Sequence, residues 1–428
     1  MKQKILQMMV AALVCAGAQA QVNSGSNGSD GAFNPASNIV IDMADHPNGI
    51  YQYTSVNISN GVTVTFIPNA NNTPVTWLVQ SDCTIAGTVS VQGNDSTNSI
   101  VGANGGPGGS RGGNGTLTPG SLPGAGLGLG GGQVGVNTNW IGGNGSYATI
   151  GDCNTNPQTS SSSGTYAQYS PGNSYGNIFE LPLLGGSGGS GDGWSAQGGG
   201  GGGGAILIAA SGTLSMSGRI LAKGGNGYYS SYNYSTGDWY QNGHGGAGSG
   251  GAIRLIASAV TGNGILDTTG GSAVYGYSCY CCGCNSVYDN AGNGRIRIEG
   301  LLDTFTGGTA GVATRGYTGI IFMPTNQQPQ LLVVSVGGVP ISASPTGVLS
   351  TPDAVLSAQQ NNPIPAVVSC ANLPLNTLIT VSVLPANGAS VSATGYNNTG
   401  TQTSSTATIS VNIPRGGGLI YATAATSN

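Results

Sequence analysis

Four cysteines lie close together in the segment Cys279-Tyr-Cys-Cys-Gly-Cys284. Thiolates at such short spacing can hold a soft metal ion such as zinc or copper(I). In an exported protein, however, the oxidising compartment favours disulfides. Neighbouring cysteines pair poorly with each other, so we expect partners from other loops and predict disulfide stapling rather than a metal site. The candidates for disulfides are Cys83, Cys153, Cys279, Cys281, Cys282 and Cys284.

A second group of candidates is aromatic. Tyrosine and tryptophan present a flat apolar face with a polar tip, which suits contacts with sugars or with proteins. The same rings can instead pack against glycine-rich loops, where missing side chains leave room. We expect packing for most of them and ligand contact for a few. The group consists of Tyr228, Tyr229, Tyr232, Tyr234, Trp239 and Tyr240.

Residues for catalysis are scarce. We expect His46 and His244, the two histidines, to be solvated loop residues. Parallel β-helix enzymes that cleave acidic polysaccharides use carboxylates with a basic residue, often with calcium. The chain offers carboxylates and arginines in its repeats, but they alternate with apolar positions, so we expect them to point outward as ordinary surface charges or as ladder pairs between strands. We therefore assign no catalytic residue, no cofactor and no metal. The charges considered are Asp82, Asp267, Glu299, Arg254, Arg295 and Arg297.

The glycine run Gly198–Gly204 resembles a phosphate-binding loop only superficially. No Gly-Lys-Ser/Thr follows it, and Ala205-Ile206 begins a strand where a phosphate loop would open a helix. Tight backbone packing at a corner of the fold, or neighbouring polyglycine strands, explains the run better.

The elements that would position these residues come from a repeat. The repeat unit consists of a strand, a turn and a second strand, with glycines at both ends. It occupies Gly204–Gly227 and recurs in Gly251–Gly271 and, in part, in Gly294–Gly300. The segment Val75–Gly93 fits the same pattern. Such a unit cannot bury its apolar face alone, so the copies must stack. We predict an all-β fold with a right-handed parallel β-helix or solenoid over residues 21–323, the hand following the general preference of parallel crossovers. The insertions 94–198, 228–250 and 272–292 are expected to be loops.

Both flanks of the repeats also predict β structure. Short alternating strands at Asn38–Asp42, Ser55–Ser59 and Val62–Ile67 would form its first turns. After Met323 glycine becomes sparse, residues 324–330 read as a linker, and evenly spaced strands fill residues 331–428. This spacing predicts an immunoglobulin-like β-sandwich.

Residues 1–20 have the pattern of a signal peptide. Lys2 and Lys4 precede an apolar stretch too short to span a bilayer, and Ala18-Gln19-Ala20 is a cleavage signal. Lipidation of Cys15 is disfavoured because Val14 stands where a small residue is expected. Removal of the two lysines leaves 8 of the 10 basic residues against 14 acidic ones, a net charge of −6. Scattered basic residues on an acidic chain exclude nucleic acid as a partner, and no further hydrophobic stretch predicts a membrane span.

The chain resembles a largely uncharacterised group of exported bacterial glycine-rich β-solenoid surface proteins with a C-terminal immunoglobulin-like sandwich. The resemblance covers residues 28 to about 300 and implies a secreted or surface-exposed solenoid, but it carries over no catalytic residue. The segments that carry it are Gly28–Gly31, Asp45–Tyr51, Tyr53–Ile58, Gly61–Phe66, Asn72–Val75, Ile85–Val89 and the Gly-Gly-Ala-Ile-x-Leu copies.

Together these features predict a non-catalytic structural or adhesive protein, secreted or on the outer surface of a bacterial cell. Its partners would be carbohydrate or other matrix components, or further copies of itself. Two alternatives stay open: a polysaccharide-binding module and a polysaccharide-degrading β-helix enzyme. Glycan binding without turnover would separate the first alternative from the second.

Overall fold

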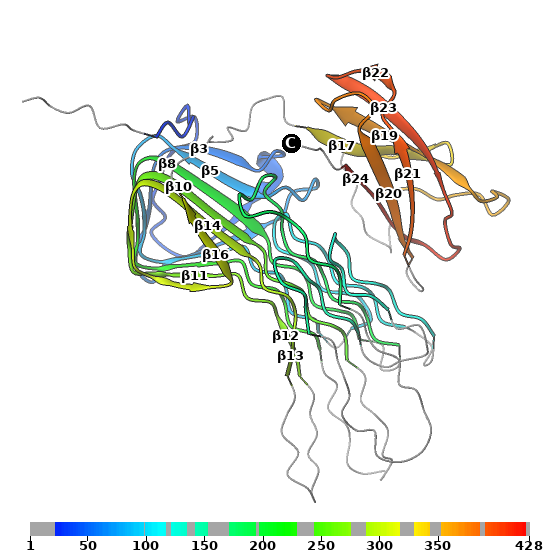
Figure 1. Cartoon of the computed structure of the whole chain (residues 1–428), viewed down its shortest axis with the longest axis horizontal. Coiled ribbons are helices and arrows are strands. Elements are labelled where there is room, and N and C mark those ends of the chain that lie inside the picture. Colours follow the sequence, from blue (N-terminus) through cyan, green and yellow to red (C-terminus); the bar gives the residue numbers. More distant parts are fainter. Residues whose placement is uncertain are drawn as a thin grey trace, which may run out of the picture.

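The computed structural model describes residues 22–97, 99–116, 121–134, 142–152, 171–193, 197–228, 244–274, 288–316, 329–342, 352–385 and 390–424. Within these ranges the protein is all-β, with a single short 3-10 helix at Met43–Asp45 (Figure 1). No helix in the described ranges has both the length and the apolar character that crossing a membrane requires. The predicted signal peptide, residues 1–20, lies outside the described ranges.

Two parallel sheets occupy residues 31–316. The first sheet contains, in spatial order, β1 (Gly31–Phe33), β3 (Ile50–Ile58), β5 (Val75–Val79), β8 (Ala205–Met216), β10 (Ala252–Gly262), β14 (Arg295–Phe305) and β16 (Val312–Gly316), with β6 (Cys83–Ile85) between β3 and β8. The second contains β15 (Gly308–Ala310), β11 (Ile265–Asp267), β9 (Arg219–Leu221), β7 (Thr88–Ser90), β4 (Thr63–Ile67) and β2 (Ile39–Asp42). The chain alternates between the sheets, so each repeat supplies a strand to both.

The register of the first sheet follows the sequence repeat. Ile253 pairs with Ile206 on one side and with Ile296 on the other. These isoleucines are fully buried in a core that runs between the two sheets, as their alternation with polar residues predicts. A turn at Asn60-Gly61 leads the chain from β3 in one sheet to β4 in the other.

Residues 329–424 form antiparallel sheets with a separate core. One sheet has the order β18 (Val339–Pro340), β17 (Gln330–Val336), β19 (Ile364–Ala371), β23 (Ser404–Val411) and β22 (Thr399–Thr401). The other has the order β21 (Val391–Tyr396), β20 (Leu378–Pro385) and β24 (Gly418–Ala424). Buried Val368, Val381 and Ile409 come from both sheets, so their apolar faces pack together. The described part of residues 331–428 is rich in strands, as the spacing predicted, and Gln330, assigned to the linker, belongs to β17.

The described parts of the insertions are not surface loops, contrary to our expectation. They are extended segments that run side by side away from the parallel sheets (Figure 1), and most of their glycines are buried. We call this layer the glycine bundle; it comprises the described glycine-rich segments within 91–204, 222–251 and 268–294. A small antiparallel ribbon of β12 (Ser272–Val274) and β13 (Tyr288–Asn290) continues from it.

Backbone hydrogen bonds in the bundle repeat every three residues. The amides of Gly198, Gly199 and Gly200 donate to three different neighbouring segments, at Ser99, Gly113 and Gly246. The next three amides return to the same segments in the same order, at Asn94, Ser110 and Ser249. Three residues per turn is the period of a polyproline II helix. The run Gly198–Gly204 is therefore explained by neighbouring polyglycine strands and not by tight packing at a corner of the fold.

Glycine is required in this packing. A Cβ added at Gly199, Gly200 or Gly201 would lie closer than 3.0 Å to the carbonyl oxygen of a neighbouring segment, a separation that real Cβ atoms essentially never show. The collagen triple helix excludes side chains from its axis for the same reason. The high glycine content is thus a packing requirement of the bundle rather than a sign of flexible loops.

Candidate functional site

Described residues from three insertions lie together at the free end of the bundle. Asp152 and Asn290 are joined by a backbone hydrogen bond of 2.8 Å, and the Asn290 amide also donates to Asp152 Oδ2 over 2.9 Å. Ser272 pairs with Asn290 across the ribbon and accepts a bond from the Gly227 amide. The bond from the Gly142 amide to the His244 carbonyl oxygen, 2.8 Å long, belongs to the same end. We call these residues the bundle tip.

The bundle tip joins residues from three distant parts of the sequence by hydrogen bonds. The residues that adjoin them in the sequence, 153–170, 229–243 and 275–287, lie outside the described ranges. Most of the predicted site residues fall in these stretches. Cys153, Cys279, Cys281, Cys282, Cys284, Tyr229, Tyr232, Tyr234, Trp239 and Tyr240 lie outside the described residues. Tyr228, at the edge of the described part, is half-exposed.

His244 is not the solvated loop residue that we expected. It is 1% exposed at the bundle tip, and its Nδ1 lies 3.2 Å from the Gly245 carbonyl oxygen. Burial, opposed by this backbone contact, lowers the pKa of His244 to about 4, so the imidazole is neutral at neutral pH. His46 is partly exposed as predicted, stacks on Tyr51 and lies 3.4 Å from an Asp30 carboxylate oxygen.

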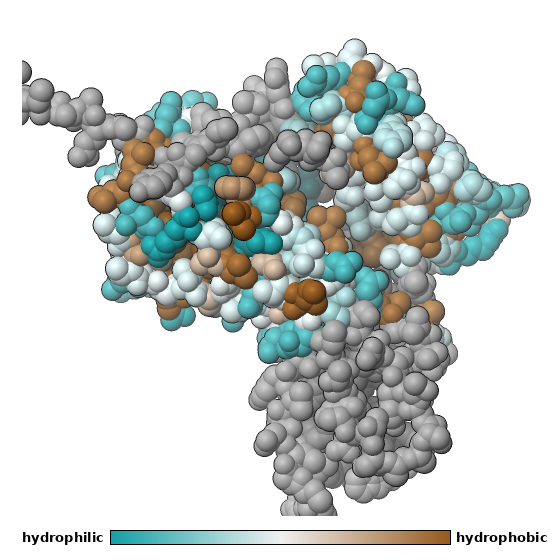
Figure 2. All heavy atoms as spheres, viewed as in Figure 1, coloured by the Kyte–Doolittle hydropathy of each residue, from teal (hydrophilic) through white to brown (hydrophobic). Residues whose placement is uncertain are grey.

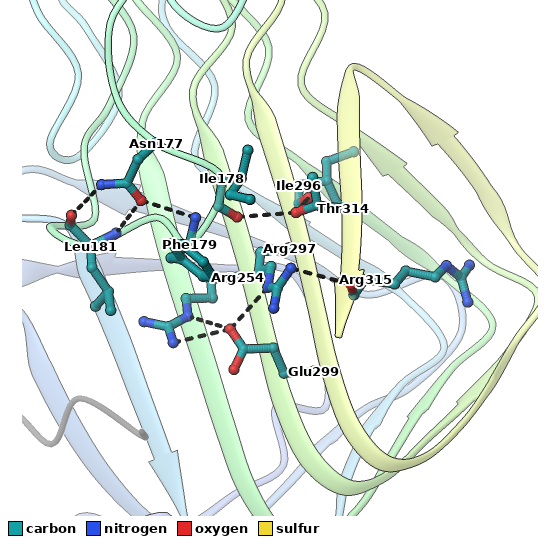
Figure 3. A network of polar contacts seen from close by, with 10 residues as sticks. All are labelled: Asn177, Ile178, Phe179, Leu181, Arg254, Ile296, Arg297, Glu299, Thr314 and Arg315. Carbon is teal, nitrogen blue, oxygen red and sulfur yellow. Dashed lines mark hydrogen bonds and ion pairs between the residues drawn. The ribbon is translucent and has the colours of Figure 1, made fainter. Parts of the chain in front are cut away.

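A cluster of buried charges lies on the face of the first sheet that is turned away from the main core (Figure 3). Glu299 Oε1 accepts hydrogen bonds from Arg254 Nε at 3.1 Å and from Arg297 Nε at 3.2 Å, and Arg254 makes a second contact of 3.0 Å. The exposed fractions of the three residues are 3%, 8% and 2% for Arg254, Arg297 and Glu299. These residues are therefore not ordinary surface charges, and Glu299 pairs with Arg254 of the neighbouring strand, the other arrangement that we expected.

The cluster is buried by residues 175–184, which we call the covering segment. The Arg295 guanidinium donates to the Tyr175 carbonyl oxygen over 3.0 Å, and Thr314 Oγ1 donates to that of Ile178 over 3.1 Å. The Phe179 ring centroid is 5.6 Å from Arg297 Cζ, a cation–π contact.

A turn built around Asn177 gives the covering segment its shape. The Asn177 side-chain oxygen accepts a bond from the Phe179 amide, and its amide nitrogen donates to the Leu181 carbonyl oxygen over 2.6 Å (Figure 3). Only Asn177 and Pro182 indicate in the sequence that a turn, and with it a covering segment, could form here.

Glu180 of the covering segment is a site residue that sequence reasoning missed. It is 1% exposed, and neither of its carboxylate oxygens has a hydrogen-bond partner among the described residues. Burial raises the pKa of Glu180 well above its usual value, although nearby Arg254 and Arg295 favour the charged form.

The chemistry open to this cluster is limited. The Oε1 atom of Glu299 is already engaged by two guanidinium groups. Glu180 and the arginines are closed off by the covering segment, so a substrate does not reach them in this conformation. Instead of catalysing a reaction, a buried carboxylate between two arginines holds neighbouring strands and the covering segment together.

The remaining candidates have structural roles. Asp82 Oδ1 accepts the Thr213 amide over 2.7 Å, and Asp267 Oδ1 accepts the amide and hydroxyl of Thr269. Cys83 is a fully buried free thiol in the main core, so the disulfide considered for it is not formed. Burial, followed by the nearby Asp82, raises the pKa of Cys83 to about 12. Among the described residues, no group of three or more His, Cys, Asp or Glu side chains is placed to hold a metal ion.

Comparison with family models, with curated proteins and with solved structures finds no match to this chain. The function must therefore be argued from the geometry above.

Proposed function

We propose that this is a secreted or cell-surface structural or adhesive protein without catalytic activity. In this proposal the two parallel sheets form a right-handed β-solenoid, the antiparallel sheets form an immunoglobulin-like sandwich, and the glycine bundle displays its insertions to the surroundings. The observation that carries the proposal is the bundle tip, where hydrogen bonds hold the ends of three insertions within one small area.

The construction of the bundle supports a role in display. Its segments are tied to several neighbours by backbone bonds, which need no charged side chain and are insensitive to salt. Only 6% of the residues in the chain are charged. On the face drawn in Figure 2, apolar side chains are scattered among polar ones on the described surface rather than joined in one continuous patch. Such a surface fits a protein that meets its partners through particular segments.

The composition of the insertions supports adhesion. They contain the aromatic group 228–240 and the cysteine cluster 279–284, and aromatic side chains are enriched where proteins bind partners. Carbohydrate or other components of a cell surface or matrix are the partners we propose, with self-association of the solenoid as a further route to assembly. The pairing of Glu299 with two arginines beneath a cover supports a non-catalytic role over a polysaccharide-degrading one.

A loop-replacement experiment tests the proposal. Residues 229–243 and 275–287 are each exchanged for a short Gly-Ser linker, and residues 343–351 of the antiparallel region are exchanged in the same way as the control. We expect wild type and control to bind glycan- or matrix-coated surfaces, and the tip variants to lose at least about tenfold in affinity. Circular dichroism would check that all variants fold.

Fractionation of producing cells tests the location. The protein is expected in the envelope or in the medium. Retention of the full-length chain in the cytoplasm, adhesion that survives both tip replacements, or turnover of a polysaccharide by the wild type would overturn the proposal.

A further inference from the structure

A polar groove crosses four repeats where the chain turns from the first parallel sheet to the second. It has a volume of about 390 Å³, within the range of about 300–1,000 Å³ typical of small-molecule sites. Its floor contains one glycine from each repeat: Gly61, Gly87, Gly218 and Gly264. All of its lining residues lie outside the glycine bundle, in the parallel sheets and the turns between them.

Stacking of the repeats explains the glycine floor. A Cβ at Gly218 would collide with the carbonyl oxygen of Gly87, and one at Gly264 with that of Gly218. The Gly61 backbone has φ = +83°, a conformation that favours glycine. The floor is therefore bare backbone, repeated at the strand spacing of about 4.8 Å. Such a surface is regular along the stacking direction, which suits an extended polymer better than a compact ligand.

One wall of the groove is a row of outward-facing residues set by the strand register. Thr88 pairs with Thr63 on one side and with Arg219 on the other, and Arg219 pairs in turn with Ile265. Arg219 is exposed, and its guanidinium has no hydrogen bond or ion pair with any part of the chain that the structure describes. Among the described residues it is therefore an unpaired cation, beside the hydroxyl groups of Thr63 and Thr88 and the apolar side chain of Ile265.

The opposite wall adds amides and a hydroxyl, from Asn60, Asn263 and Ser217. No carboxylate and no aromatic ring lines the groove. Hydroxyl and amide groups hydrogen-bond to polyhydroxylated chains, and a guanidinium pairs with a carboxylate in bidentate fashion. Nucleic acid is disfavoured because one cation cannot neutralise a row of phosphates.

We propose that this groove binds an acidic polysaccharide laid across the repeats, with Arg219 paired to the carboxylate of a uronic acid unit. A sugar unit in an extended chain is comparable in length to the spacing between the strands, so successive units meet successive repeats. The site goes beyond the display function of the bundle tip, because no residue of the tip is among the described residues that line it.

Titration calorimetry with a galacturonate hexamer and, for comparison, a neutral cellulose hexamer tests the proposal. Wild type is expected to bind the acidic hexamer, and Arg219→Gln to weaken that binding at least about tenfold, the loss of one charge-assisted pair. Thr88→Tyr, which fills the groove without changing its charge, is expected to weaken it similarly. Arg415→Gln, an exposed arginine in the antiparallel region whose guanidinium donates to the Ala358 carbonyl oxygen, is the matched control and should bind as wild type does.

Three results would overturn the proposal: no binding of the acidic hexamer by wild type, unchanged binding by Arg219→Gln, or equal binding of the neutral hexamer. Arg219 and Thr88 face away from the core, so both variants should fold, and unfolding temperatures verify this. The tip-replacement variant separates the two proposals, because it should keep its affinity for the acidic hexamer even if adhesion fails.

Discussion

Replacing Gly200 by alanine tests whether the glycine bundle is a close-packed layer. The Gly200 amide donates to the Gly246 carbonyl oxygen over 2.8 Å, and its own carbonyl accepts from Gly189 over 3.0 Å. An added Cβ would point at the carbonyl oxygen of Gly225, closer than 3.0 Å. Three different segments thus surround this residue. The atoms that the Cβ would meet belong to the backbone and not to the end of a flexible side chain.

The expected loss of stability follows from the backbone groups that the added methyl group would displace. A methyl group forced into a packed interior costs about 1–3 kcal/mol. Displacing Gly200 also weakens its two backbone bonds, worth about 1 kcal/mol each. We expect local destabilisation of about 3–5 kcal/mol, opposite in sign to the stabilisation of about 0.4–1 kcal/mol that Gly→Ala brings where alanine fits. The matched control is Gly308→Ala in β15, where a Cβ would meet nothing within 4 Å and φ is not left-handed.

Hydrogen exchange is the appropriate assay because the chain contains more than one cooperative unit, for which a single unfolding free energy is not defined. Amides of residues 198–204 should exchange faster in Gly200→Ala by the factor that corresponds to the lost stability, whereas Gly308→Ala should leave them unchanged. Equal protection of these amides in wild type and Gly200→Ala would refute the close-packed bundle.

Three further predictions concern buried titratable groups. Burial lowers the pKa of His244 from 6.5 to about 4, so on acidification the unfolded state takes up a proton before the folded state does. The stability of the bundle tip should therefore fall as the pH drops from 6.5 to 4. The expected loss is about 3 kcal/mol, at about 1.36 kcal/mol per pH unit. His244→Gln should remove this pH dependence of hydrogen exchange; a wild-type tip equally protected at pH 7 and pH 4 would contradict it. For Glu180 the folded pKa is raised, so the covering segment should lose stability as pH rises above 4.5, and Glu180→Gln should slow proteolysis there at pH 7. Faster cleavage of this variant would show that Glu180 is ionised and paired. Glu299→Gln leaves Arg254 and Arg297 buried without a countercharge and should cost about 3–5 kcal/mol in thermal unfolding of the parallel sheets, whereas Asp303→Asn, at an exposed pair with Arg315, should cost under about 1 kcal/mol.

The strands were predictable because their signal is local. Alternation of apolar and polar residues with period two marks a strand wherever it occurs, and the repeat of Ile206 at Ile253 and Ile296 specified the parallel register in advance. The antiparallel strands after residue 330 were visible for the same reason. The alternation also placed Arg254 on the face opposite Ile253 and Leu255, which lie in the core.

The sequence by itself determined the strands of the repeats and of the antiparallel region and their core-facing residues, but not the short strands β1, β12, β13, β15 and β16. Only the tertiary structure decided what covers the other face: Arg254, Arg297 and Glu299 are buried by a segment that lies more than a hundred residues from β14, with a contact at 136 residues' separation between Ile178 and Thr314. The same holds for the glycine segments. A residue without a side chain has no apolar period to read, and the bonds that order it run between backbones distant in the sequence, so its partners exist only once the chain has folded.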